Sequence, residues 1–313
     1  MLQIIADGLV IGSIISLGAI GLSLTLSIVR FSNFSHGELL GWGGYFALTA
    51  TAAFAAASGA LGVTAQTALT SPLGPFSFGW TLLGALAAAA ILTALLALAL
   101  DSVLFRRLRT QGSITLVIAS FGAALALRNL LLFWYGGVPQ YYSQNLQIAI
   151  PIVPRSAWGG LRITADQLFV LALTLVTVTA LHLFLRHSTL GRSMRATAIN
   201  PSLARVAGID PERILRATWI IGGLLAAVAG VFAGITVQLR PTMGVDLLLP
   251  LFAAVVLGGI GSVWGAVLGG FIVGLAESAS VSVVGAEYRA AAAFAVLILI
   301  LLVRPHGLFG EKS

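Results

Sequence analysis

The sequence predicts an all-α, polytopic integral membrane protein with eight or nine transmembrane helices. The first observation is composition, because 58% of the residues are hydrophobic and only 9% are charged, whereas a soluble domain carries about 25% charged residues. The second is a mean hydropathy of +1.03. No long polar linker interrupts the chain, so residues 1–313 are expected to form a single transmembrane domain.

The expected spans are apolar stretches that can cross ~30 Å of hydrocarbon, which takes roughly 20 helical residues. Six stretches have this length, namely 3–29, 39–57, 80–105, 113–135, 167–185 and 217–239. The stretch 247–284 is too long for one span, so we expect two spans, or one span and a re-entrant piece, with a turn near 258–261. The last stretch, 290–303, is short for a full crossing.

Lysine and arginine predict the orientation, because they concentrate in cytoplasmic loops. The connections 30–38, 106–112 and 186–216, together with the tail after 303, carry twelve of these residues, against four in the alternate connections. The first set is therefore expected in the cytoplasm, with the N-terminus outside and the C-terminus inside. In a membrane protein this basic charge indicates topology, so nucleic-acid binding is not expected.

Small residues recur at every fourth position on three segments, which lets helix backbones approach closely in lipid. The three series are Gly258, Ser262, Ala266, Gly270, Gly274 and Ser278; Gly222, Ala226, Gly230 and Gly234; and Gly8, Gly12 and Ser16. The pattern favours helix packing, and a surface that slides during alternating access is the alternative.

The connection 186–216 is the one long, strongly polar stretch of the chain. Asn200 and Asp210 each precede a proline, which predicts a capping side chain followed by proline at the first helical position. Gly208 is placed to end the intervening helix in a left-handed conformation. We therefore expect short helices over 191–199 and 201–207.

These short helices could lie on the lipid surface or dock into a cytoplasmic partner. Their caps fix a defined shape, and Leu203, Val206 and Ile209 offer an apolar edge. Both features favour docking.

A second polar cluster lies at 30–38, between two long apolar stretches. It contains Asn33, His36, Gly37 and Glu38. One interpretation is a tight cytoplasmic turn in which His36 and Glu38 bond to backbone groups. The other is that the cluster lines or gates the path of a solute and offers donors and acceptors to a zwitterion.

Several chemistries are not expected of this chain. Its single lysine, Lys312, does not lie in a glycine-rich phosphate loop, so ATP hydrolysis by that mechanism is excluded. It has no cysteine, and its four histidines lack partners at metal-binding spacing, so no cofactor or metal is expected. An ion-coupled carrier or channel is the alternative class, but its candidate groups, Asp7, Glu38, Arg128 and Glu277, show no opposite-charge pair.

Three ordered blocks resemble the branched-chain amino-acid ABC permease family. The first is Asn-Phe-Ser-His-Gly-Glu at 33–38, where the family has alanine in place of Ser35. The second runs from Gly191 to Asn200 and from Ala204 to Asp210. The third comprises the glycine-rich runs at 256–262 and 265–270.

The resemblance implies the permease subunit of an ATP-driven importer in the bacterial inner membrane. It implies a second homologous permease, two cytoplasmic ATPases that bind ATP and magnesium, and an extracytoplasmic solute-binding protein. By the same resemblance, the ATPase-coupling residues are expected to be Arg192, Arg195, Asn200, Ala204, Gly208 and Asp210. The family also includes urea and amide importers, so the solute stays open between these and an amino acid.

Overall fold

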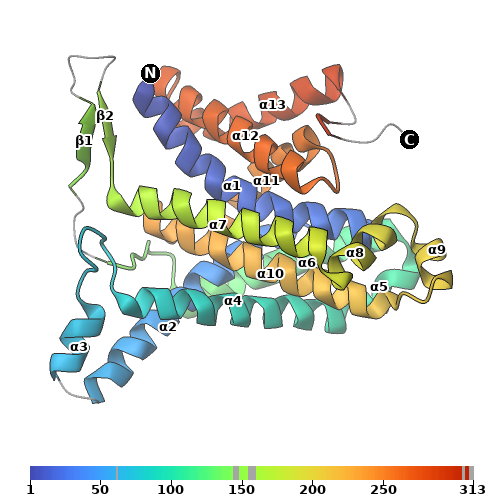
Figure 1. Ribbon diagram of the computed structural model, residues 1–313, viewed down its shortest axis with the longest axis horizontal. Helices are drawn as coiled ribbons and strands as arrows, with labels where there is room; N and C mark the ends of the chain where they lie inside the picture. The colour runs from blue at the N-terminus through green and yellow to red at the C-terminus, as the bar shows by residue number, and fades with distance from the viewer. Residues whose placement is uncertain (61–62, 144–147, 154–159, 305–306, 310–313) are drawn as a thin grey trace.

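The computed structural model describes residues 1–60, 63–143, 148–153, 160–304 and 307–309, and it is a bundle of long helices (Figure 1). Within these residues, eight helices are long and apolar enough to cross a membrane. They are α1 (Leu2–Val29), α2 (His36–Ala60), α4 (Trp80–Leu100) with its continuation to Gln111, α6 (Ser113–Tyr135), α7 (Ala165–His187), α10 (Pro211–Thr236), α12 (Val263–Val283) and α13 (Arg289–Val303) with the short turn η3 (Ala286–Tyr288). The apolar helix α11 (Met243–Gly258) is shorter and is not one of these eight. The predicted all-α, polytopic fold is confirmed.

The remaining elements lie at the two ends of the bundle (Figure 1). At one end, α4 continues through a π-helical turn η1 (Asp101–Phe105), α5 (Arg106–Leu108) and a 3-10 turn η2 (Arg109–Gln111), beside α8 (Thr189–Ile199) and α9 (Pro201–Val206). At the other end lie α3 (Val63–Thr70) and an antiparallel hairpin of β1 (Ile150–Val153) and β2 (Leu161–Ile163). Neither α3 nor this hairpin was predicted.

The arginine-rich connections meet at the end that holds α5, α8 and α9. Arg30 donates from Nη2 to the carbonyl oxygens of Ala198, at 3.3 Å, and Ile199, at 3.5 Å. Arg109 reaches Glu212 at the start of α10. The arginine-rich connections, although far apart in the sequence, therefore lie at one end of the bundle. This is the arrangement that the count of lysine and arginine residues predicts for the cytoplasmic face. Arg155 and Lys312, which entered that count, lie outside the described residues.

The predicted turn near 258–261 is confirmed. It also shows that one expectation was wrong, because the series of small residues that begins at Gly258 does not continue along a single helix. Helix α11 ends at Gly258, and Gly259 and Gly261 have φ values of 96° and 87°. The side chain of Ser262 then caps α12 by accepting from the N–H of Gly265 at 3.0 Å. Gly258 and Ser262 are therefore not on one helix: Gly258 packs on Gly265, where a methyl group on either would overlap the other's backbone.

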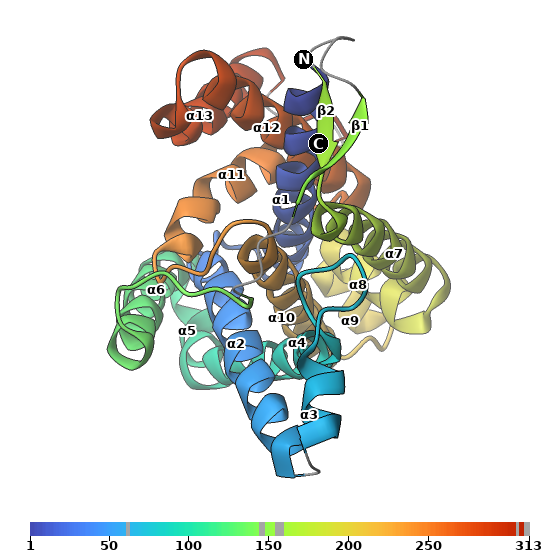
Figure 2. The same cartoon turned by 90° about the vertical axis from the view of Figure 1, so that its left-hand side faces the viewer.

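The rest of that series packs against α1, which lies between α12 and α10 (Figure 2). A methyl group on Gly270 would lie 2.6 Å from the Cα of Ser16, and one on Gly274 would lie 2.6 Å from the carbonyl oxygen of Gly8. Ser16 donates to the carbonyl oxygen of Val267 at 2.9 Å. The series of small residues on α1 and the series on α12, which includes the buried Ala266, therefore form one close contact between the two helices. In lipid, where no hydrophobic effect drives helices together, such close backbone contact stabilises helix packing.

Replacing Gly270 by leucine should destabilise the protein by about 1–3 kcal/mol or more, because the new side chain must separate α1 from α12. The midpoint of thermal unfolding in detergent measures this loss. Gly122→Leu is the matched control, since an added methyl group on Gly122 of α6 meets nothing within 4 Å. Equal midpoints for the two variants would contradict the packing described here.

Candidate functional site

The polar cluster at 30–38 lies deep in the bundle. Arg30 ends α1 in a left-handed conformation, with φ 63°, and the non-helical residues 31–35 then run back along α1. His36 donates from Nε2 to the carbonyl oxygen of Gly18 at 3.1 Å. Gly18 precedes the end of α1 by three helical turns, or about 16 Å. The interpretation of 30–38 as a tight turn with His36 and Glu38 bonded to backbone groups is thus confirmed for His36 and wrong for Glu38, whose carboxylate oxygens have no hydrogen-bond partner among the described residues. The turn also does not stay at the end of α1, because α2 begins beside the middle of that helix.

A second helix begins at the same place. The first turn of α11 touches the first turn of α2 through glycine on both sides. A methyl group on Gly244 would lie 2.8 Å from the carbonyl oxygen of Gly37, and one on Gly37 would overlap the carbonyl of Gly244. Two helix N-termini, each with the positive end of its dipole, thus meet inside the membrane. Half-helix termini of this kind form solute sites in transporters.

Short polar contacts hold the re-entering residues. Asn33 accepts at Oδ1 from the N–H of Ser35, at 3.1 Å, and from its hydroxyl, at 2.6 Å. Ser120 of α6 accepts from the N–H of Phe34 at 3.1 Å. Asn33, Ser35, His36 and Glu38 are all at most 1% exposed, so this cluster is closed to solvent in the present conformation.

Glu38 is the unusual member of the cluster. Both of its carboxylate oxygens are buried, and neither has a hydrogen-bond partner among the described residues. Arg128 of α6 and Asp246 of α11 are its charged neighbours. The sequence analysis expected no opposite-charge pair for these groups, and this was wrong for Glu277, which lies 3.9 Å from Arg289 of α13. Glu38 and Arg128 form no ion pair within the described residues, but Arg128 is close enough to act on Glu38 by its charge.

Sequence reasoning missed the contribution of α11 to this cluster. Gly244 and Asp246 come far along the chain from Glu38, so no local spacing connects them. The sequence did contain one signal for the start of α11, because Asp246, in the first turn of that helix, follows soon after Pro241. Carboxylates in the first turns of both helices offset the positive ends of the two dipoles.

The second candidate site is the element formed by α8 and α9 at the arginine-rich end. Asn200 accepts at Oδ1 from the N–H of Leu203 at 3.1 Å, and Asp210 accepts from the N–H of Glu212 at 2.9 Å. Gly208 has φ 81°. The predicted helices and all three predicted end signals are confirmed, with boundaries shifted by at most two residues.

The six residues expected to contact an ATPase are not all at the surface. Arg192 is exposed and donates to the carbonyl oxygen of His187 at 3.2 Å, while Arg195 donates to the carbonyl oxygen of Leu185 at the end of α7. Ala204 is only 5% exposed. The expectation that Ala204 contacts a partner is corrected, because its side chain packs inside the protein.

The exposed surface of this element carries arginines and also large apolar side chains. Ile209, which was expected on the apolar edge, is instead partly buried against the core. Ile199, Leu203 and Val206 are 79%, 65% and 85% exposed. We define these three side chains as the apolar edge of α8–α9. Large apolar side chains grouped at a membrane protein's polar end are typical of a protein contact.

An ion-pair cluster anchors the start of α10 next to this element. Arg109 pairs with Asp101 and, at 3.2 Å, with Glu212, and Arg106 lies 3.6 Å from Glu212. Asp101 stands in the π-helical turn that ends α4. The cluster joins α4 to α10, and the sequence analysis did not find it because Glu212 lies far along the chain from the other three residues.

Residues 4–303 match the model of the family described as branched-chain amino acid transport system / permease component. The chain belongs to this family. It is 32% identical to the branched-chain amino acid permease protein BraD of Pseudomonas aeruginosa and 30% identical to the permease protein LivH of Escherichia coli K12, with 100% of this chain and 96% of each relative covered. A probable LivH of Methanocaldococcus jannaschii is 27% identical, over 98% of this chain and 92% of that protein.

Membership of the branched-chain amino acid permease family identifies the chain as a permease component and a multi-pass membrane protein. The resemblance found at 33–38, 191–210 and 256–270 is thereby confirmed, since the match extends over nearly the whole chain. Two of these blocks form the polar cluster at the α2–α11 junction and the α8–α9 element.

Glu38→Gln should lower solute uptake by roughly tenfold or more, because it removes the charge of a carboxylate that has no partner among the described residues and is free to accept from the solute. A hydrogen bond to a charged group contributes about 1.5–3 kcal/mol. Uptake into proteoliposomes by the assembled transporter measures it. Arg128→Gln should also lower uptake. Expressed as free energy, the loss in the double variant should not exceed the sum of the losses in the two single variants. Glu287→Gln, at an exposed carboxylate of η3, is the matched control. Wild-type uptake in both Glu38→Gln and His36→Ala would refute a role for the cluster.

Proposed function

We propose that the chain is the membrane-spanning permease of an ATP-driven importer that carries branched-chain amino acids across the bacterial inner membrane. The printed names of the full-length relatives support the solute class. The observation that carries the proposal is the α8–α9 element: a capped, rigid pair of helices that presents the apolar edge at the arginine-rich end. An ion-coupled carrier needs no such element.

The partners follow from what the chain lacks. Its single lysine is Lys312, so the phosphate-binding loop of an ATPase must be on other subunits. We propose two ATPase subunits, which bind ATP and magnesium and grip α8–α9, and a second homologous permease. At the opposite end, α3 and the β1–β2 hairpin offer the surface for an extracytoplasmic solute-binding protein (Figure 1).

Movement of α8–α9 can reach the α2–α11 junction through a short series of contacts. Arg30 ties the end of α1 to the end of α8. His36 ties the start of α2 to Gly18 in the middle of α1. When ATPase closure displaces α8, α1 therefore transmits the displacement to the junction, and we propose that the junction opens as the solute gate.

The opened junction has the chemistry to pass a branched-chain amino acid. The carboxylate of Glu38 suits the ammonium group of the solute, and the N–H groups of the two helix starts suit its carboxylate. Phe34 lies between Phe121 and Phe252, with ring centroids 6.2 and 5.4 Å away, and offers an apolar surface to a branched side chain.

Uptake by the reconstituted transporter tests the solute class. Unlabelled leucine, isoleucine and valine should each compete with labelled leucine, whereas urea should not compete. Competition by urea alone would exclude the amino-acid assignment. Uphill uptake by the chain alone, driven by an ion gradient, would exclude the ATP-driven mechanism.

Leu203→Asp should abolish the stimulation of ATP hydrolysis by solute-loaded binding protein, because it places a charge in an apolar contact. The comparison variant is Leu203→Ile, which keeps the apolar surface and should stay within about twofold of wild type. Hydrolysis is measured in proteoliposomes, and the amount of permease in the membrane serves as the control for folding. Full stimulation in Leu203→Asp would show that the apolar edge is not the contact.

A further inference from the structure

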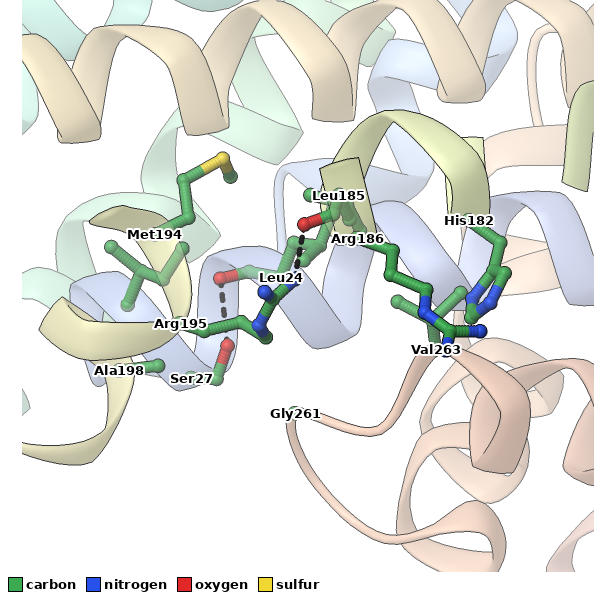
Figure 3. A pocket seen from close by; sticks show the side chains of 11 residues that line it. Leu24, Ser27, His182, Leu185, Arg186, Met194, Arg195, Ala198, Gly261 and Val263 are labelled. Carbon is green, nitrogen blue, oxygen red and sulfur yellow. Dashed lines mark hydrogen bonds between the residues drawn. The ribbon is translucent and has the colours of Figure 1, made fainter. Parts of the chain in front are cut away.

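A pocket of about 330 Å³ lies between the bundle and α8. It is lined by the end of α1, the end of α7, the inner side of α8 and the turn between α11 and α12 (Figure 3). Its volume is at the lower end of the range of about 300–1,000 Å³ for small-molecule sites. It therefore has room for a compact polar group and not for long hydrocarbon chains.

Two arginines give the pocket its positive charge, and a histidine adds a hydrogen-bonding group. The side chains of Arg186 and Arg195 both extend into it, with His182 beside Arg186 (Figure 3). Neither arginine forms an ion pair with a carboxylate in the part of the chain that the structure describes. Trp264 donates to Nδ1 of His182 at 3.1 Å, which leaves Nε2 to carry the proton of the neutral ring as a further donor. The pocket is thus a site for an anion.

The pocket lies at the inner surface of the membrane. Its walls come from the last turns of α1 and α7 and from the first turn of α12, where three spans begin or end. Trp264, which is 48% exposed, stands beside it, as expected of a tryptophan at the level of lipid headgroups. Leu183, Phe184 and Leu268 continue from this level as exposed apolar side chains, at 50%, 40% and 43%.

We infer that this pocket binds the phosphate group of an anionic phospholipid of the inner leaflet. Arginine guanidinium groups are suited to phosphate oxygens, and basic pockets between spans on the cytoplasmic side bind lipid headgroups. The acyl chains lie outside the pocket, against the exposed apolar side chains of α7 and α12. The bound phosphate bridges α8, through Arg195, to α7, through Arg186, and so tethers the α8–α9 element to the membrane.

Native mass spectrometry of the purified, detergent-solubilised permease tests this inference. The protein is titrated with phosphatidylglycerol or with phosphatidylcholine of the same acyl chains. The wild type should bind phosphatidylglycerol more tightly. Arg186→Gln should weaken that binding about fivefold, the effect of one basic residue near anionic lipid. Arg186→Lys should keep most of it, since charge is retained.

Arg213→Gln is the matched control, because Arg213 is an exposed arginine at the same end of the bundle but outside the pocket. It should bind phosphatidylglycerol as the wild type does. Equal binding of the two lipids by the wild type, or an equal loss in Arg186→Gln and Arg213→Gln, would overturn the inference. Displacement of phosphatidylglycerol by millimolar inorganic phosphate would also overturn it, by showing a site for free phosphate. This measurement does not depend on transport, so it stands apart from the proposed function.

Discussion

The meeting of two helix N-termini inside the membrane is the constraint on which the rest of the structure depends. Backbone N–H groups that have no partner are costly in hydrocarbon, so the starts of α2 and α11 must be enclosed by protein. Gly37 and Gly244 allow their backbones to touch, while α10 packs against α2 and α1 packs against α11. The tight glycine packing of α1 on α12 holds one wall of this enclosure in place.

In this arrangement, one helix contacts both the buried polar cluster and the α8–α9 element. The α1 helix carries the acceptor of His36 in its middle and the arginine that ties it to α8 at its end. A displacement at the cytoplasmic end therefore acts directly on the buried cluster. The ion-pair cluster of Arg109 with Asp101 and Glu212 keeps α4 and α10 fixed relative to each other, so that α1 and α8 can move against a rigid support.

Features determined by local sequence were predicted well. The caps at Asn200 and Asp210, the left-handed Gly208 and the turn near Gly259 each depend on a few neighbouring residues, so their chemistry is readable without the fold. The position of Glu38 was not readable. Its surroundings come from Arg128 and Asp246 on two other helices, and hydropathy does not reveal that α2 begins beside the middle of α1.

Contacts across the fold also decided which residues of α9 reach the surface. Ala204 and Leu203 are neighbours in one short helix, and composition alone gives no reason to separate them. The structure buries the first and exposes the second, because a helix of fewer than two turns can press only one side against the bundle. The apolar edge of α8–α9 therefore became clear only from the packing.

The late position of α11 in the chain has a consequence for biosynthesis. Residues 31–35 and the start of α2 leave the ribosome long before Met243–Gly258 are made, and in lipid alone their polar groups would have no cover. The nascent chain must therefore hold this segment at the membrane surface, or in the insertion machinery, until α11 emerges to enclose it. The order of synthesis thus makes the buried junction one of the last parts of the protein to reach its final position.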